Sequence, residues 1–596
     1  MRRLIVPLAI AALVLAWPVH PARADSIVQE IVELADTQLD ITVQGVGNTD
    51  YLIDLSKVSA KFFTAHYAVL DARITYDLSK VLNPQCPPNI TLRTSDAQKT
   101  AGDYVRRSAA ANVAVQRVAI AQPRERYYLA QVRRDGVGVA TTGACGSLQN
   151  PPVAFTLRVR LFASSPAGTS NFTFATTHMP TRGDGEPSIA IDRRHGDAAY
   201  VVAPIGGPAA LGGFESGTDF WRSFDHGATW TWSQPRFSLN STAGFDNHVV
   251  VDGSGAVLIA DLAATTVFVG KSTDQGANFQ FGSAGGNDAD RQWLAVYTPP
   301  GATTSTKYFL DYHDINVDNL PYECIGSNGG TAWEVACHPM TTNAIVAANA
   351  FGNTFNGNQV FDSRGVVNAV FASPALGDPN LTTRNIYLAQ SADGIAWTNT
   401  LVYQAPVGSD VGGLFPVIAV DAADDLFVVW SERIAPAGAS VIKLASSSDH
   451  GATWSKKPVT LSMAGQSAVL PWIAAGARGQ VDVVWVGSTS ASTNDPTADW
   501  YMYMAQSQTA LSGTGFTVSR VTPQPVRYGT VCLSGIGCTT GFDDGRILLD
   551  FTSVDYDSAC DAFIAYANSG PEGTYGDPSM PFTDVARQTS GTTICH

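Results

Sequence analysis

The chain has 596 residues, of which 15% are charged and 45% hydrophobic, with 54 glycines and 19 tyrosines. This composition is typical of a folded, turn-rich β protein and argues against disorder. The net charge of −15 argues against nucleic acid as a partner, because it repels phosphate backbones and no Lys/Arg run offsets it.

The first 24 residues predict a cleaved secretory signal peptide. Arg2 and Arg3 precede an apolar stretch, and Ala22-Arg-Ala24 supplies a small-residue cleavage site. A membrane anchor is the alternative, but the apolar run is short and no later stretch approaches about 20 apolar residues. We therefore expect a secreted or cell-surface protein with no membrane span after signal removal. The sequence does not give its oligomeric state.

Residues 25–175 predict a small β-sandwich accessory domain. The stretches ITVQGVGNTDYLIDL, HYAVLDARITYDL and AFTLRVRLFAS alternate like half-buried strands. An Arg-rich stretch in this domain is interpreted as a solvated face rather than a binding patch; it comprises Arg106, Arg107, Arg117, Arg124, Arg126, Arg133 and Arg134. The stretch NFTFATT that follows is expected to supply the last strand of the next domain.

A repeated motif organises residues 180–596. SFDHGATW at 223–230 and SSDHGATW at 447–454 share six consecutive letters, and STDQGANF at 272–279 is a third copy. SADGIAW at 391–397 and SNGGTAW at 327–333 are one residue shorter. Worn copies begin at Ser507 and Ser590, so the serine positions define seven units of a repeat architecture.

The context of the repeats predicts a β-propeller. Each unit is near 50 residues long and contains about four short strands, the innermost almost continuously apolar, as in HVVVDGSGAVLIADL. Seven blades are favoured, with six as the alternative. The motif falls between the third and fourth strands, where Asp accepts hydrogen bonds from a tight turn and Gly supplies a positive φ. We expect a structural role for Ser223, Asp225, Gly227, Trp230, Ser272, Asp274, Gly276, Phe279, Asp393, Trp397, Ser447, Asp449, Gly451 and Trp454.

These motifs resemble Asp boxes, also called BNR repeats, and the chain resembles the secreted sialidase-like β-propellers. The resemblance covers most of residues 180–596 and is specific for the fold rather than for function. It implies that the Asp boxes lie on the face opposite the active site. The overall expectation is an all-β chain in which a small β-sandwich precedes an Asp-box propeller.

Eight cysteines in an exported chain predict disulfides. The expected pairs are Cys324–Cys337, Cys532–Cys538, Cys86–Cys145 and Cys560–Cys595, although sequence does not fix the connectivity. A zinc site is the alternative, but no C-x2-C or H-E-x-x-H spacing supports one. We expect no metal and no cofactor.

Candidate site residues stand where the predicted inner strands begin or the second strands end. The resemblance to sialidases implies three kinds of residue among them. These are an arginine clamp for a substrate carboxylate, a tyrosine nucleophile with a glutamate base, and an aspartate acid/base. The clamp would be Arg291, Arg433 and Arg546, and the catalytic residues Tyr312, Glu432 and Asp290. Further substrate-binding candidates are His313, Trp293, Glu186 and His248.

The chain departs from the sialidase pattern at its first inner strand. Sialidases carry an Arg-Ile-Pro motif there, whereas this chain has Glu186-Pro187. They also have six blades rather than seven. Sialic-acid specificity is therefore in doubt. The leading hypothesis is an exported sialidase-like glycoside hydrolase acting on a glycan or polysaccharide. The alternatives are a non-catalytic propeller that binds carbohydrate or protein, and a structural or envelope-assembly component.

Overall fold

The computed structural model describes most of the chain. The described residues are 30–65, 67–82, 87–94, 104–108, 114–121, 123, 125–134, 152–164, 172–179, 184–205, 217–235, 244–263, 265–285, 289–315, 318–342, 344–345, 354–375, 382–434, 439–495, 497–533, 548–569 and 581–595. The predicted signal peptide, Arg124, Arg546, Cys86, Cys145 and Cys538 lie outside these ranges. Within them, no helix has the length and apolar character that crossing a membrane requires.

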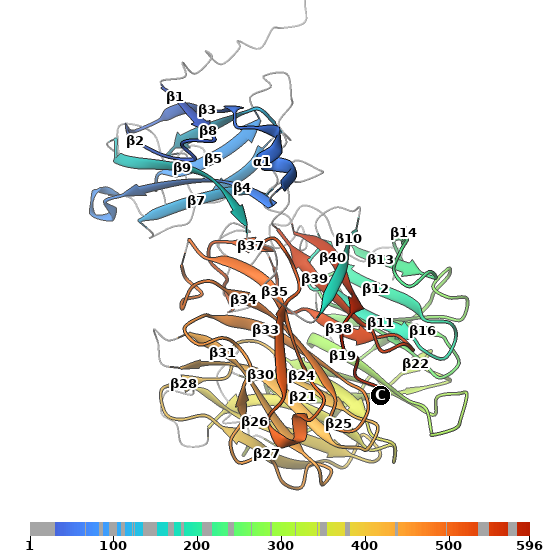
Figure 1. Cartoon of the computed structure of the whole chain (residues 1–596). Helices are drawn as coiled ribbons and strands as arrows, with labels where there is room; N and C mark the ends of the chain where they lie inside the picture. Colours follow the sequence, from blue (N-terminus) through green and yellow to red (C-terminus); the bar gives the residue numbers. More distant parts are fainter. Residues whose placement is uncertain are drawn as a thin grey trace, which may run out of the picture.

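The N-terminal part is a two-sheet β-sandwich, drawn in blue to teal in Figure 1. In spatial order its first sheet is β1 (Glu30–Ala35), β3 (Thr49–Lys57), β8 (Tyr127–Arg133), β5 (Asn89–Thr94) and β6 (Tyr104–Ser108). The second is β2 (Asp40–Val46), β9 (Ala154–Ser164), β4 (Tyr67–Tyr76) and β7 (Val115–Ala121). The short helices α1 (Ala60–Ala65) and η1 (Leu78–Lys80) lie between strands. Apolar side chains of both sheets share one core.

Seven further sheets form the blades of a β-propeller. Blades one to three are β11 (Ser188–Asp192), β12 (Ala198–Pro204), β13 (Thr218–Ser223) and β14 (Thr231–Ser233); β15 (Asn247–Val251), β16 (Val257–Ala263), β17 (Thr266–Ser272) and β18 (Gln280–Ala284); and β19 (Ala289–Tyr297), β20 (Lys307–Asp314), β21 (Pro321–Ser327), β22 (Ala332–Trp333) and β23 (His338–Pro339). Blades four and five are β24 (Phe355–Phe361), β25 (Val367–Pro374), β26 (Thr383–Ser391) and β27 (Thr398–Gln404); and β28 (Ser409–Asp410), β29 (Val417–Val420), β30 (Leu426–Ile434), β31 (Ser440–Ser447) and β32 (Val459–Thr460). Blade six is β33 (Ala468–Ala475), β34 (Val481–Ser488), β35 (Asp499–Ser507), β36 (Phe516–Arg520) and β37 (Arg527–Tyr528), with the short helix η3 (Ala510–Ser512).

Blade seven closes the ring with strands from both ends of the propeller. Its order is β38 (Ser553–Tyr556), β39 (Ala562–Asn568), β40 (Phe582–Ser590) and β10 (Thr173–His178). β10 precedes blade one in sequence, yet it pairs antiparallel with β40 as the outermost strand (Figure 1). The expectation that NFTFATT supplies the last strand is thus confirmed, and the blade count is seven rather than six.

The Asp boxes form hydrogen-bonded hairpin ends between the third and fourth strands. In the first box, Thr229 N and Oγ1 donate to Asp225 at 2.8 and 2.6 Å, and Gly227 N donates to Ser223 Oγ at 2.9 Å. Gly227 has a φ of 76°, a left-handed value that favours glycine. The same bonds recur around Asp274 and Asp449. In the shortened box, Asp393 accepts instead from the backbone two and three residues on.

A second repeated turn, which the sequence analysis missed, joins the first two strands of five blades. In four blades an aspartate accepts from the backbone N–H groups two and four residues further on, and in blade one from those two and three residues on. These aspartates are Asp192, Asp252, Asp362, Asp421 and Asp557. The turns form Asx-type caps that fix the hairpins of the inner strands. Four of them are readable in the sequence after an inner strand, as D-x-x-G at Asp252 and Asp362 and as D-x-x-x-D at Asp421 and Asp557.

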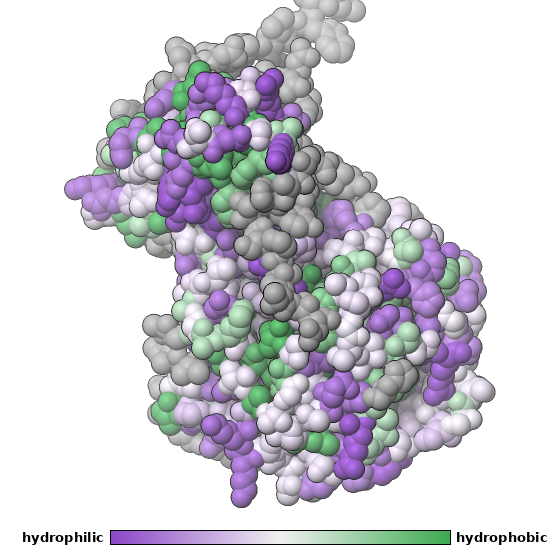
Figure 2. All heavy atoms as spheres, in the orientation of Figure 1, coloured by the Kyte–Doolittle hydropathy of each residue, from purple (hydrophilic) through white to green (hydrophobic). Residues whose placement is uncertain are grey.

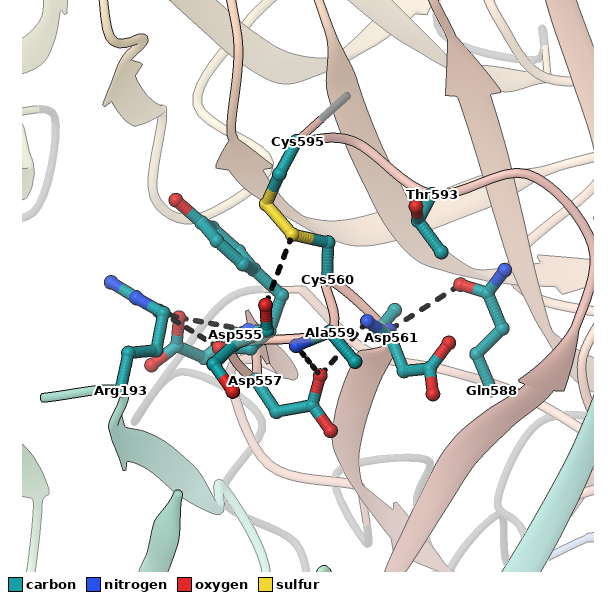
Figure 3. Close-up of a disulfide and its surroundings, with 12 residues drawn as sticks. Arg193, Asp555, Asp557, Ala559, Cys560, Asp561, Gln588, Thr593 and Cys595 are labelled. Atoms are coloured by element: carbon teal, nitrogen blue, oxygen red, sulfur yellow. Dashed lines mark hydrogen bonds and ion pairs between the residues drawn. A yellow bond between two sulfur atoms is a disulfide. The ribbon is translucent and has the colours of Figure 1, made fainter. Parts of the chain in front are cut away.

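Two of the expected disulfides are confirmed. Cys324 pairs with Cys337 beside β21, and Cys560 pairs with Cys595. The second bond ties the end of the chain to the β38–β39 turn, beside Asp557 and its hydrogen bonds to Ala559 and Asp561 (Figure 3). Cys532 is also disulfide-bonded.

Arg117 corrects the expectation that the Arg-rich stretch is a solvated face. Its guanidinium is buried between the sandwich and blade six, where it contacts Asp71 of β4 and lies 2.7 Å from Asp499 of β35. It also donates to Thr497 O at 2.5 Å. Arg134 of the same stretch is buried as well. Arg117 therefore links the two parts through an ion pair largely shielded from water. On the face of the molecule that Figure 2 shows, hydrophilic and hydrophobic residues are interspersed.

Replacing Arg117 by alanine should destabilise the chain much more than replacing Arg158. Arg117→Ala removes the cation that the buried Asp71 shares with the partly buried Asp499; Asp71 keeps Arg160 as a partner at 2.6 Å, so we expect a cost of about 3 kcal/mol. Arg158 pairs with Asp40 at 2.5 Å, but both side chains are nearly half exposed, so its loss costs less than about 1 kcal/mol. Chemical denaturation of both variants measures this, and equal effects would contradict the buried bridge.

Removing Asp225 should lower the melting temperature, and the difference should fade in acid. Hydrogen bonds from Thr229 and Ser223 lower the pKa of Asp225 to about 2. A depressed folded-state pKa stabilises above the unfolded value near 4, and this contribution is lost as pH falls toward 2. Melting curves of wild type and Asp225→Ala at pH 7 and pH 3 test this, with Glu30→Ala, an exposed carboxylate of the sandwich, as control. A difference that does not depend on pH would refute this role of the carboxylate.

Candidate functional site at the propeller axis

The inner strands begin at the propeller axis, on the face opposite the Asp boxes. This follows from the antiparallel order, because the first strand starts and the third strand ends at opposite edges of a blade. Residues at these starts form one group, in which every blade takes part. We call it the axial cluster: Glu186, Asp246, His248, Arg291, Trp293, Asn356, Phe415, Trp472, Asp550 and Phe551.

Arg291 is the central cation of the axial cluster. It sits in a bulge of β19 with a φ of 36°, and its side chain is 3% exposed. Its guanidinium carbon lies 3.7 Å from the ring centre of Trp293 and 4.1 Å from that of Phe551. Nη2 donates to Asn247 O at 3.2 Å, whereas Nε and Nη1 make no hydrogen bond. Two nitrogen atoms of a buried guanidinium thus have no acceptor, which makes them candidates for contact with a ligand.

Glu186 is the buried acid of the cluster. Its backbone is left-handed, with a φ of 51°, and the residue is 1% exposed. Burial first, and then the negative charges of Asp550 and Asp246, raise the pKa of Glu186 well above its usual value. Its Oε2 atom makes no hydrogen bond. Burial therefore favours the protonated form of the Glu186 carboxyl group.

Asp246 connects this acid to solvent. Its Oδ1 atom lies 3.9 Å from Arg291 Nη1, and its side chain is 14% exposed, in contrast to those of Glu186 and Arg291. Gln292 Nε2 donates a hydrogen bond to the backbone carbonyl oxygen of Asp246 at 2.8 Å, which fixes the backbone at this point. A molecule entering from solvent would thus meet the Asp246 carboxylate before Glu186.

Aromatic rings fill the axis around Arg291. The Trp293 ring centre lies 5.2 Å from that of Trp472, 5.3 Å from Phe551 and 5.5 Å from Phe415. His248 packs edge-on against Trp293 at 5.2 Å, and its Nδ1 accepts from Leu294 N at 3.0 Å. Burial, with Arg291 adding to it, lowers the pKa of His248 to about 3, so this ring is neutral.

Left-handed backbone conformations mark the inner-strand starts in five blades. The non-glycine residues with positive φ there are Glu186, Arg291, Leu414, Leu470 and Leu549. Such conformations cost of order 1 kcal/mol or more for residues with a side chain and are concentrated at functional sites. Glu186 and Arg291 themselves belong to the axial cluster, and its members Phe415 and Asp550 directly follow Leu414 and Leu549.

A second pair of buried carboxyl groups lies in blade three, between its second and third strands. Asp311 and Glu323 are cross-strand neighbours, and both are fully buried. Gln359 donates to Glu323 at 3.3 Å. Burial raises the pKa of each, and Asp311 raises that of Glu323 further. This pair is distinct from the Glu186–Asp246 pair, although Asp311 is within electrostatic range of Arg291.

The structure brings five of the predicted site residues together. Glu186, His248, Arg291 and Trp293 belong to the axial cluster. Asp290 adjoins it, since its Oδ1 accepts from Arg291 N at 3.0 Å. Of the predicted catalytic residues, only Asp290 is therefore next to the cluster.

The other predicted residues lie elsewhere. Tyr312 is buried in the core shared by blades two and three, where it stacks on Tyr322 at 5.8 Å. Glu432 is a hydrogen-bond partner of Tyr403, whose pKa burial raises to about 12. Arg433 is half exposed and lies 2.6 Å from Asp410. His313 is buried in blade three, where burial lowers its pKa to about 4.

From sequence, Asp246, Phe415 and Trp472 are placed at the starts of inner strands but receive no role, and Asp550 and Phe551 are not assigned to the site. Asp246, Phe415 and Trp472 each stand directly before or at a predicted inner strand, which was the available signal. Asp550 and Phe551 follow a left-handed leucine, a feature that sequence does not show. Among the described residues, no three His, Cys, Asp or Glu side chains are arranged to hold a metal ion.

Comparison with known proteins gives only distant likenesses. No protein-family model matches the chain, and no curated protein matches it. A solved structure of a Dyadobacter fermentans protein of unknown function is similar, with 12% identity and a TM-score of 0.42, covering 70% of this chain and 98% of that one. A Penicillium chrysogenum alpha-L-arabinanase has 12% identity and a TM-score of 0.36, covering 72% and 98%. The NanB sialidase of Streptococcus pneumoniae has 10% identity and a TM-score of 0.34, covering 92% and 99%. Identities this low leave the activity to be argued from the site itself.

Replacing Glu186 by glutamine should raise the melting temperature at neutral pH. A carboxyl group whose folded pKa is raised binds its proton more tightly when folded, so wild-type stability falls as pH rises above the unfolded value near 4.3. Glutamine removes this loss, and we expect a gain on the order of 2 °C at pH 8 that shrinks toward pH 4. Calorimetric scans across pH measure it, with Glu125→Gln as the exposed control. A gain that is the same at every pH would contradict the raised pKa.

Proposed function

We propose that the chain is a glycan-acting hydrolase whose chemistry takes place at the axial cluster. The observation that carries the proposal is the position of the buried Glu186, whose raised pKa favours the protonated form, beside the partly exposed Asp246 and the Arg291 nitrogen atoms that make no hydrogen bond. Glycoside hydrolysis needs such a pair: one carboxylic acid and one carboxylate.

Each residue has a defined role in the proposed reaction. Glu186 donates its proton to the glycosidic oxygen while the bond to the anomeric carbon breaks, and the electron pair leaves with that oxygen. Water adds to the anomeric carbon and loses a proton to Asp246. A later proton exchange between solvent and the pair restores the starting state. The free donors of Arg291 orient sugar hydroxyls, which can accept hydrogen bonds.

This assignment replaces the tyrosine mechanism drawn from sequence. A tyrosine nucleophile needs its glutamate base within hydrogen-bond reach. Tyr312 and Glu432 instead have separate partners, Tyr322 and Tyr403. Arg433 forms an ion pair with Asp410, whereas the Arg291 guanidinium packs against Trp293. We therefore place the chemistry on Glu186 and Asp246.

A non-catalytic glycan-binding protein is the second candidate. The observation that favours it is the dense aromatic packing along the axis, where Trp293 contacts Trp472, Phe551 and Phe415. Such packing leaves Asp246 as the accessible part of the Glu186–Asp246 pair. Binding without turnover by the wild-type protein would establish this alternative.

Glu186→Gln should abolish turnover while leaving glycan binding intact. Loss of a general acid lowers kcat by about 10²–10⁴-fold, whereas KM stays within about threefold because the amide keeps the shape of the side chain. A panel of glycans and aryl glycosides identifies the substrate, and kinetics then follow on that substrate. Glu323→Gln is the matched control, since it removes another buried acid outside the axial cluster. Equal losses in both variants would contradict the assignment, and a comparable loss in Tyr312→Phe would restore the tyrosine mechanism.

A further inference from the structure

Carboxyl groups outnumber cations in the axial cluster. Arg291 is the cation, and Asp246, Glu186, Asp550 and Asp290 all interact electrostatically with it. Even with a proton on Glu186, three carboxylates face one guanidinium. The region where a ligand meets Arg291 therefore carries excess negative charge.

The surroundings of Arg291 also leave no room for a carboxylate clamp. Both ring contacts, to Trp293 and Phe551, cover the guanidinium carbon within about 4 Å, so a ligand can approach only at an edge. One end of that edge, Nη1, already has the Asp246 carboxylate at 3.9 Å. A ligand carboxylate binding there in bidentate fashion would lie beside the carboxylate of Asp246. Sugar hydroxyls can accept from Nε and Nη1 without this repulsion.

We propose that the axial site takes glycans without acidic groups, that is, neutral or amino-bearing sugars, and rejects sialylated, uronic and sulfated ones. The inference rests on the proposed function and names its substrate class. It also agrees with the net charge of −15, which repels polyanions at a distance. An ammonium group on the sugar gains from Asp246 and Asp290, so amino sugars bind at least as tightly as their neutral counterparts.

A charge-matched glycan panel tests the substrate class directly. The purified full chain is assayed for binding and for release against neutral oligosaccharides of glucose, galactose, xylose, arabinose and N-acetylglucosamine, against glucosamine oligosaccharides, and against sialyllactose, galacturonan, glucuronan and sulfated glycans. Binding or cleavage confined to neutral and amino members supports the proposal. Acidic members bound or cleaved as well as neutral ones overturn the substrate class but leave the hydrolase assignment standing. No binding or cleavage of any member overturns both.

Asp290→Asn tests the charge argument within the site. Asparagine can still accept from Arg291 N, so the bulge keeps its hydrogen bond while one negative charge is lost. The ratio of amino-sugar to neutral-sugar affinity should fall about threefold to tenfold at low salt. Asp449→Asn removes a carboxylate from an Asp box on the opposite face and should leave the ratio unchanged. An unchanged ratio in Asp290→Asn, or equal changes in both variants, would overturn the charge argument.

Discussion

Ring closure is the constraint on which the rest of this structure depends. Seven sheets of four or five strands can bury their faces only against each other, so the last blade must meet the first. The closure uses a strand that precedes blade one in the sequence: β10 pairs with β40 and becomes the outermost strand of blade seven. Side chains add to it across the seam: Ser553 Oγ donates to Pro187 O at 2.8 Å, and Asp197 accepts from Ser558 N at 2.8 Å. The Cys560–Cys595 disulfide lies in the same blade and holds Cys595 at the turn between β38 and β39.

Closure also explains where the candidate site lies. Once seven inner strands surround one axis, residues distant in sequence are forced together at their starts, as Glu186 and Asp550 are. The axis is filled by aromatic rings, and this low-polarity surrounding raises the pKa of Glu186 and keeps His248 neutral. The scaffold thus produces the shifted pKa values through burial first and through neighbouring charges second.

The sequence predicted the repeated parts of the molecule well and the unique parts poorly. The box around Asp225 could be read directly, because its function is local: every hydrogen bond falls within a few residues. The closing strand could be inferred because one blade lacked a partner. The positions of Tyr312 and Glu432 could not be predicted. A side chain near the end of a strand can point to the propeller axis or to the neighbouring blade, and the sequence does not distinguish these directions. The left-handed backbone at Arg291 and Leu549, which decides this, is set by tertiary packing rather than by local preference.

The two kinds of position carry different kinds of information. Asp225 and Asp449 stand in identical hexapeptides and make identical bonds, so neither distinguishes one blade from another. At the opposite face the equivalent positions differ in every blade: Glu186 in the first, Arg291 in the third, Phe415 in the fifth and Trp472 in the sixth. A ring of seven identical charged residues there would place seven like charges around one axis, and burying unpaired like charges is strongly unfavourable. One cation, a few carboxyl groups and several aromatic rings can share that space, because Arg291 offsets part of the negative charge and the rings cover the faces of its guanidinium. Specificity therefore arises where the repeat breaks, and the conserved letters of the motif locate the site only by marking the other face.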